Sequence, residues 1–341
     1  MKVIAITPFR KMDYLTSLLI EGLDEMGIEI IASDGGNGVK RVYSDSEIIS
    51  HSKSADYILV FWGKGPDERW PRSSSLRHPK YYLLDTINRP DRTAYIDGSE
   101  WTSTGHPEIF EIVPSPFDSN KKLIKQAAEA ALDPTRYKGE PWINQKMFDY
   151  CRWYFKRECY PEDKKAGIIP LSFGCFNRDF INQESTLKKD IDIFCCFGQS
   201  YTGLRHQIIN YCQSLKNKGL NVILSSHVGH EEYLNLIRRS SISISAWGGG
   251  NCCNREWEVI ANKSCCFVQK HMIEITNKPQ DGIHWVEYET MDEFDKKINF
   301  YLNNREFCDK IGTDGFLFAL ENHTSISRAK TMINFMRSDA I

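Results

Sequence analysis

The order of hydrophobic and polar residues predicts that strands and helices alternate along most of the chain. Short apolar runs indicate strands, and apolar residues three or four positions apart indicate helices. The predicted strands are residues 2–6, 28–32, 57–61, 81–84, 92–96, 109–113, 190–197, 221–224, 242–246 and 265–269. The predicted helices are residues 13–26, 121–132, 203–216, 231–239, 254–262, 291–302, 305–321 and 325–336. Such alternation is typical of parallel sheets covered by helices.

A less regular passage after residue 133 separates two α/β series. The length of 341 residues suits two domains of ordinary size. We therefore expect an α/β protein with two Rossmann-like parallel-sheet domains, residues 1–165 and 166–324. Ligands bind beyond the carboxyl ends of strands in such sheets, so the two domains should face a ligand-binding cleft between them.

A glycine-rich loop between a predicted strand and a predicted helix is the clearest candidate site. Gly248, Gly249 and Gly250 follow strand 242–246 and precede the helix that carries Arg255 and Glu258. Bare backbone N–H groups before a helix attract anions. Arg255 and Glu258 share a helix face because they lie three positions apart. The pair could hold a nucleotide, or it could be a surface ion pair on an ordinary crossover.

Composition and charge narrow the class of protein. With 41% hydrophobic residues, 26% charged residues and a net charge of −2, the chain has a globular composition and no overall attraction to nucleic acid or anionic lipid. No apolar run reaches membrane-spanning length. The eleven cysteines contain no C-x-x-C, which argues for reduced thiols and against a structural zinc site. We therefore expect a cytoplasmic protein.

The carboxyl half resembles the group-1 type glycosyltransferases of the GT-B architecture, nearest to the branch described as spore-maturation-protein-like. The resemblance covers roughly residues 165–338. It lies in residues 194–198 followed by Arg205, in YLNLIRRSSISIS (233–245), in Gly248–Gly250, in Arg255-Glu256-Trp257-Glu258 with Ala261, and in DGIHWVEY (281–288). It implies a GT-B fold, in which the last helix, within residues 325–341, packs back on the first domain.

This resemblance implies transfer of a sugar from a nucleotide-diphosphate sugar, most simply a UDP-sugar, to an acceptor hydroxyl, without a metal or other cofactor. Glu258 would hold the donor's ribose, the glycines would approach the diphosphate or sugar, and Arg205 would balance the diphosphate charge. The donor-binding residues expected on this basis are Gly198, Arg205, His227, Gly248, Gly249, Gly250, Asn251, Arg255 and Glu258.

One position departs from the family pattern. Many group-1 enzymes have a second glutamate eight positions before the ribose-binding one, and here that position is Gly250. Asn251 or backbone amides would then contact the sugar. The departure keeps a second hypothesis open, a non-catalytic nucleotide- or sugar-binding module of the same fold.

Acceptor activation should come from the amino half. Asp97 is the candidate general base, with Glu100 and His106 as rivals. The alternative for Asp97 is an Asx-turn that organises Gly98 and Ser99.

A polar loop in the amino half carries basic and aromatic residues. Lys64, Arg69, Trp70 and Arg72 could contact an acceptor, although such runs are usually solvated loops. They keep a further alternative open, a DNA-modifying glycosyltransferase that acts on a hydroxylated base.

Two patterns of possible metal ligands carry less weight. Asp190-Ile191-Asp192 spells D-x-D but begins a strand, where alternation explains it better. His227 and His230 lie in or beside a loop, where polar histidines are common.

Overall fold

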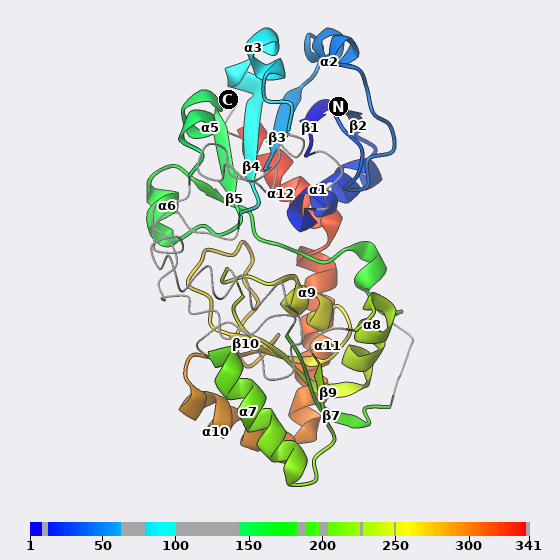
Figure 1. Cartoon of the computed structure of the whole chain (residues 1–341), viewed down its shortest axis with the longest axis vertical. Coiled ribbons are helices and arrows are strands. Elements are labelled where there is room, and N and C mark those ends of the chain that lie inside the picture. Colours follow the sequence, from blue (N-terminus) through cyan, green and yellow to red (C-terminus); the bar gives the residue numbers. More distant parts are fainter. Residues whose placement is uncertain are drawn as a thin grey trace, which may run out of the picture.

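The chain forms two parallel β-sheets flanked by helices. The computed structural model describes residues 1–8, 13–62, 79–99, 143–182, 188–197, 204–225, 228–248 and 250–338. Figure 1 shows one sheet with its helices in the upper half of the molecule and the other in the lower half. The expected α/β class with two parallel-sheet domains is confirmed.

The amino-terminal sheet has six parallel strands in the order β2-β1-β3-β4-β5-β6. Its strands are β1 (Lys2–Ile6), β2 (Glu29–Ala32), β3 (Tyr57–Phe61), β4 (Thr93–Asp97), β5 (Trp153–Lys156) and β6 (Ile169–Pro170). The helices of this part are α1 (Tyr14–Glu25), α2 (Asp45–Ser52), α3 (Leu83–Ile87), α5 (Gln145–Tyr150) and α6 (Pro161–Lys165).

The carboxyl-terminal sheet has five parallel strands in the order β11-β10-β9-β7-β8. Its strands are β7 (Ile191–Cys196), β8 (Val222–Ser225), β9 (Ser240–Ser245), β10 (Cys265–Gln269) and β11 (Val286–Tyr288). The helices that follow these strands are α7 (Leu204–Asn217), α8 (His230–Arg239), α9 (Asn254–Ile260), α10 (Met291–Asn303), α11 (Arg305–Asn322) and α12 (Ser325–Ser338).

Both sheets use the same winding order. In each sheet, the first strand lies between the second and the third. The second strand is added on one side of the first strand, and the third strand is added on its other side. This reversal leaves a crevice at the carboxyl ends of the first and third strands, where ligands of doubly wound folds bind. In the carboxyl-terminal sheet these strands are β7 and β9, and the residues just past them, Phe197 and Ala246, mark the expected position of a ligand.

The last helix returns to the amino-terminal sheet. α12 packs along α1, as Figure 1 shows. The two backbones approach so closely that a Cβ on Gly22 of α1 would lie 2.1 Å from the carbonyl oxygen of Ser325 and 2.9 Å from the Cβ of Ala329. Only glycine fits at this contact. The chain therefore crosses between the halves twice, once after β6 and again between α11 and α12.

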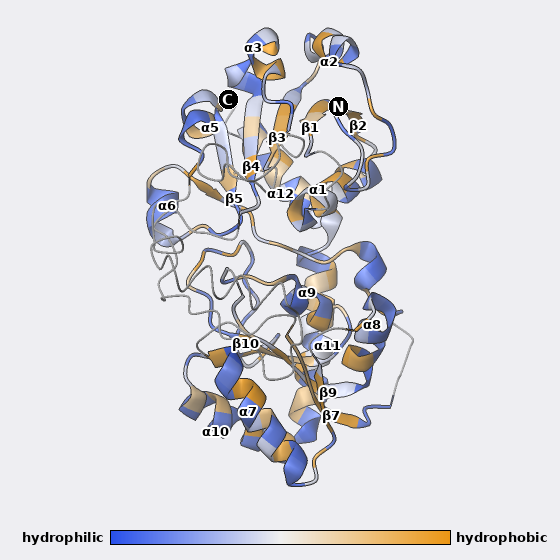
Figure 2. Cartoon of the chain, in the orientation of Figure 1, coloured by the Kyte–Doolittle hydropathy of each residue, from blue (hydrophilic) through white to orange (hydrophobic). Residues whose placement is uncertain are grey.

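Helices form where sequence supplies both a cap and an apolar face. The Asp13 carboxylate caps α1 by accepting the N–H of Thr16 at 2.8 Å, and α1 buries Leu15, Leu18 and Leu19. Figure 2 shows that α7 carries both hydrophobic and hydrophilic residues, as expected of a helix that covers a sheet on one side. No helix of the described segments is long and apolar enough to cross a membrane.

The structure corrects one predicted strand. Residues 81–84 do not form a strand, because Leu83 begins helix α3. Four apolar residues in a row do not distinguish a strand from a buried helical turn. The predicted strand 109–113 and helix 121–132 lie outside the described residues. The sequence analysis did not anticipate α2, α5, α6, β5, β6 or β11. Because β6 is the sixth strand of the first sheet, that sheet extends beyond residue 165.

The contact at Gly22 generates a prediction. Gly22→Ser should lower the free energy of unfolding by about 1–3 kcal/mol, because the added Cβ forces α12 away from α1. Thermal and urea unfolding of the purified protein would measure it. Gly229→Ser is the matched control, since a Cβ there meets nothing within 4 Å and serine is a favoured residue at the helix cap that Gly229 occupies. Equal stability of the two variants would contradict the close contact.

Candidate functional site

Two arginine side chains flank one phenylalanine ring where β7 and β9 end. Phe197 directly follows β7, Arg205 lies in the first turn of α7, and Arg255 lies in the first turn of α9. Each guanidinium carbon is 5.0 Å from the centre of the Phe197 ring. Because a ring face attracts cations, Phe197 holds two positive charges close together that would otherwise repel each other. The pair concentrates positive charge at this end of the sheet.

Arg205 also anchors the glycine-rich loop. Its Nη2 donates to the carbonyl oxygen of Ala246 at 2.9 Å, and only 5% of the residue is exposed. A Cβ on Gly248 would lie 2.9 Å from the same nitrogen, so a side chain there would push the guanidinium aside. The structure thus brings Arg205 and Gly248 together, and their binding of a donor stays a prediction.

Arg255 has polar atoms that the described protein does not pair. Its Nε and Nη1 are buried, and neither has a hydrogen-bond partner among the described residues. Buried donors of this kind normally have a partner, and an unpaired one calls for a ligand, water or ion. Arg255 is therefore the better placed of the two arginines to donate to a bound anion.

Glu258 lies one turn along α9 from Arg255. It is 5% exposed, and its Oε1 accepts from Asn254 Nδ2 at 3.1 Å. Burial, followed by the nearby charge of Asp179, raises the pKa of the Glu258 carboxyl to about 7, while Arg255 lowers it. A carboxylate in such surroundings gains from any further hydroxyl donor.

A carboxylate of the amino-terminal domain contacts the glycine-rich loop. Glu158, two residues after β5, accepts from the backbone N–H of Asn251 at 2.7 Å and of Cys252 at 3.2 Å. Arg157 lies beside it, with Nε 3.2 Å from Oε1 of Glu158. Burial raises the pKa of Glu158, and Arg157 and the two amides oppose that rise. Two backbone amides just after the glycines thus bond to a carboxyl group of the other domain, and the predicted binding of a ligand anion by Gly248–Gly250 stays a prediction.

The remaining predicted donor residues divide into two groups. Gly250 and Asn251 are buried in the loop, where Asn251 Oδ1 accepts from the Met272 N–H at 3.1 Å. Gly198, His227 and Gly249 lie outside the described residues, so their roles stay predictions.

Asp97 lies at the end of β4 and is 1% exposed. Its Oδ2 accepts from Tyr154 Oη and from Lys156 Nζ, both at 2.7 Å, and its Oδ1 accepts from the Ser99 N–H at 2.9 Å. The last bond is the Asx-turn considered as the alternative role. The assignment of Asp97 as a general base stays a prediction. The same holds for Glu100 and His106, which lie outside the described residues.

The loop residues Lys64, Arg69, Trp70 and Arg72 also lie outside the described residues, so their contact with an acceptor stays a prediction. Asp190 and Asp192 flank the start of β7, the end opposite to the arginine pair, and bind Arg239 and Arg305 at 2.6 and 2.7 Å. The two aspartates of the D-x-D sequence therefore form surface ion pairs with arginines.

Several residues at the site escaped the sequence analysis. Glu158 lay in no motif. Phe197 and Tyr233 lay within the stretches of the family resemblance but were not singled out, and Asp179 and Tyr14 approach Glu258 only through the fold. One group that could hold a metal also occurs in the described segments, Cys252, Glu256 and His271. Its ligands lie four and fifteen positions apart in a pattern that matches no usual metal motif.

Comparisons with known proteins agree with this architecture. Residues 182–334 match the model of a family described as glycosyl transferase-like. No curated protein matches the sequence.

Three solved structures align with almost the whole chain. Anabaena Alr3699/HepE in complex with UDP-glucose is 9% identical, with a TM-score of 0.55 over 99% of this chain and 100% of that one. An alpha-glucosyltransferase in complex with UDP-glucose and DNA containing an abasic site is 10% identical, with a TM-score of 0.59 over 99% of each chain. A glycosyltransferase from Rickettsia africae ESF-5 is 10% identical, with a TM-score of 0.56 over 99% and 98%.

The likeness extends over both domains in each case, and the family match covers most of the second sheet and its helices. The chain therefore has the GT-B fold of these structures, and its residues 182–334 are similar to a glycosyl transferase-like family.

Proposed function

We propose that the protein is a glycosyltransferase that moves a sugar from a nucleotide-diphosphate sugar to an acceptor hydroxyl. The observation that carries the proposal is the pair of guanidiniums on Phe197 at the carboxyl ends of β7 and β9. Breaking the bond between sugar and diphosphate leaves negative charge on the diphosphate. Positive groups fixed in advance around that charge stabilise the transition state.

The donor proposed for this site is a UDP-sugar. Two of the similar structures are described as complexes with UDP-glucose. In this chain the unpaired Nε and Nη1 of Arg255 would donate to diphosphate oxygens, and Glu258 would accept from the ribose hydroxyls. Arg205 and Arg255 supply the positive charge that a divalent metal supplies in other transferases, so we propose that the transfer step itself uses no metal.

The acceptor side is proposed to lie on the amino-terminal domain. Asp97 remains its candidate base and Lys64, Arg69, Trp70 and Arg72 its candidate contacts. Three similar structures of an alpha-glucosyltransferase contain DNA, but the comparisons do not favour a DNA acceptor over other acceptors. If the protein is instead a non-catalytic binding module, an assay with a nucleotide sugar will detect donor binding but no sugar transfer.

The proposed location is the cytoplasm. Its support is that all eleven cysteines are free and ten of them are buried. A reducing compartment preserves thiols in that state.

Ligand binding to purified protein tests the donor site. Arg255→Gln should weaken UDP binding by about 10- to 100-fold in calorimetry, because a charge-assisted hydrogen bond contributes about 1.5–3 kcal/mol. It should leave the binding of uridine, which has no phosphate, almost unchanged. Arg239→Gln is the matched control, since Arg239 pairs with Asp190 at the far end of β7. A loss of UDP affinity in Arg239→Gln equal to that in Arg255→Gln would contradict the assignment.

The ribose contact has its own test. Glu258→Gln should weaken both UDP and uridine several-fold, because an amide accepts hydroxyl hydrogen bonds less strongly than a carboxylate. The same variant should bind 2′,3′-dideoxy-UDP as the unmodified protein does. If the variant weakens the dideoxy compound just as much as UDP, Glu258 does not contact the ribose.

The role of Asp97 can be separated from its structural contacts. Asp97→Asn should lower the free energy of unfolding by roughly 3 kcal/mol, because it leaves the Lys156 ammonium buried and unpaired. The double variant Asp97→Asn, Lys156→Met should recover most of that stability in urea unfolding. Sugar transfer by this folded double variant at the original rate would remove Asp97 from the candidate bases, and a fall of 10²-fold or more would retain it.

A further inference from the structure

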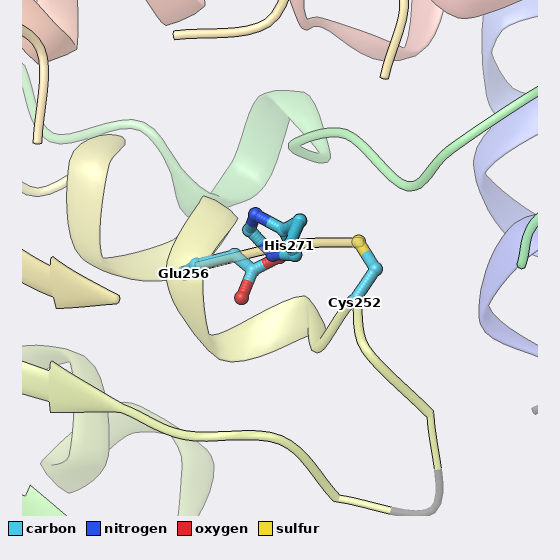
Figure 3. Close-up of side chains that lie close together, drawn as sticks. All are labelled: Cys252, Glu256 and His271. Carbon is cyan, nitrogen blue, oxygen red and sulfur yellow. The ribbon is translucent and has the colours of Figure 1, made fainter. Parts of the chain in front are cut away.

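Three side chains that bind metals converge behind the glycine-rich loop. Cys252 comes from the loop, Glu256 from the first turn of α9, and His271 from the segment after β10, as Figure 3 shows. One ligand atom from each lies within 4.8 Å of the others. Cys252 is 3%, Glu256 1% and His271 6% exposed. The group is therefore a built and buried cluster, distinct from the arginine pair that faces Phe197.

The chemistry of the three groups selects zinc. A thiolate, an imidazole and a carboxylate are the ligand types of Zn²⁺, whereas Mg²⁺ and Ca²⁺ take oxygen ligands. His271 Nε2 and Glu256 Oε1 share a hydrogen bond at 2.9 Å, and a zinc ion bound by both atoms would take the place of the shared proton. Three protein ligands and one water form a common zinc site.

The charges of the cluster balance on binding zinc. A thiolate from Cys252 and a carboxylate from Glu256 carry two negative charges, and a neutral His271 adds none. Zn²⁺ therefore makes a buried site without net charge, which avoids the large cost of burying an unpaired ion. Binding would release the thiol proton and any proton on the imidazole to solvent.

Two further observations point to a group that the protein atoms alone do not provide. The indole Nε1 of the fully buried Trp257 donates to Cys252 Sγ at 3.3 Å. A neutral thiol is a weak acceptor, and a metal-bound thiolate is a stronger one. In addition, His271 Nδ1 and Asn251 Nδ2 are buried without a hydrogen-bond partner among the described residues. Buried polar atoms of this kind commonly accompany an ion or a water.

We propose that Cys252, Glu256 and His271 bind one zinc ion. The ion would join the glycine-rich loop, α9 and the segment after β10. Glu158 borders the site, since its Oε1 accepts the N–H of Cys252. The zinc would thus fix the loop at the junction of the two domains. This inference does not depend on the proposed sugar transfer, because the site holds structure and need not contact the donor.

Metal content tests the proposal. The untagged full chain is stripped with chelator, incubated with one equivalent of zinc chloride, passed over a desalting column and analysed by mass spectrometry for zinc. We expect about one zinc per chain in the unmodified protein and in Cys253→Ala. We expect less than a tenth of that in Cys252→Ala, Glu256→Gln and His271→Gln. Cys253 is the matched control, because its sulfur lies at 3.8 Å from the Ala246 carbonyl oxygen rather than in the cluster.

A second measurement needs no variant and so remains decisive if a variant misfolds. Cobalt(II) added to the stripped unmodified protein should give the near-ultraviolet absorption of a thiolate bound to cobalt, and zinc should abolish it. Zinc should also raise the thermal unfolding midpoint of the unmodified protein by several degrees. Absence of bound zinc and of the cobalt signal would overturn the proposal, and so would full zinc retention by His271→Gln.

Discussion

The bond between Glu158 and the amides of Asn251 and Cys252 is the contact on which the geometry of this molecule depends. It joins the end of a strand in one domain to the glycine-rich loop of the other. Burying a carboxylate is costly, and here two N–H groups and the neighbouring Arg157 offset that cost. The loop leads directly into α9. A fixed loop backbone therefore also fixes the start of the helix that carries Arg255 and Glu258. These hydrogen bonds between the domains thus help to set the position of the candidate donor site.

The repeated winding order explains why this site forms at one place in the second sheet. The reversal between β7 and β9 brings Phe197 and Ala246 to the same edge although they are about fifty positions apart in sequence. Arg205 crosses that gap by bonding to the Ala246 carbonyl, and Phe197 receives both guanidiniums on its ring. Gly248 passes so close to Arg205 that a side chain at this position would displace the guanidinium. The sheet topology and the glycine in the loop therefore both contribute to the position of Arg205 at this end of the sheet.

The sequence predicted the fold where local pattern determines structure. The apolar runs 2–6, 57–61 and 265–269 coincide with β1, β3 and β10, because buried parallel strands read as continuous hydrophobic segments. β5 escaped notice since it ends in Lys156, a charge that can be buried only because Asp97, 59 positions earlier, pairs with it. Within the site, Arg205 and residues of the glycine-rich loop and α9 were singled out from sequence motifs. The contact of Phe197 with both arginines, the bond of Glu158 to the loop, and the meeting of Cys252, Glu256 and His271 require the tertiary structure.

The packing of α12 against α1 has a consequence for how the chain reaches its native state. Gly22 lies near one end of the sequence and Ser325 near the other, so the first helix meets its partner only after some three hundred residues have been synthesised. Contacts of such long sequence separation form slowly. During translation the amino-terminal lobe would keep an apolar helix face uncovered until the carboxyl-terminal lobe has emerged. The folding of the two domains is therefore coupled, because α1 needs a partner that lies near the other end of the chain.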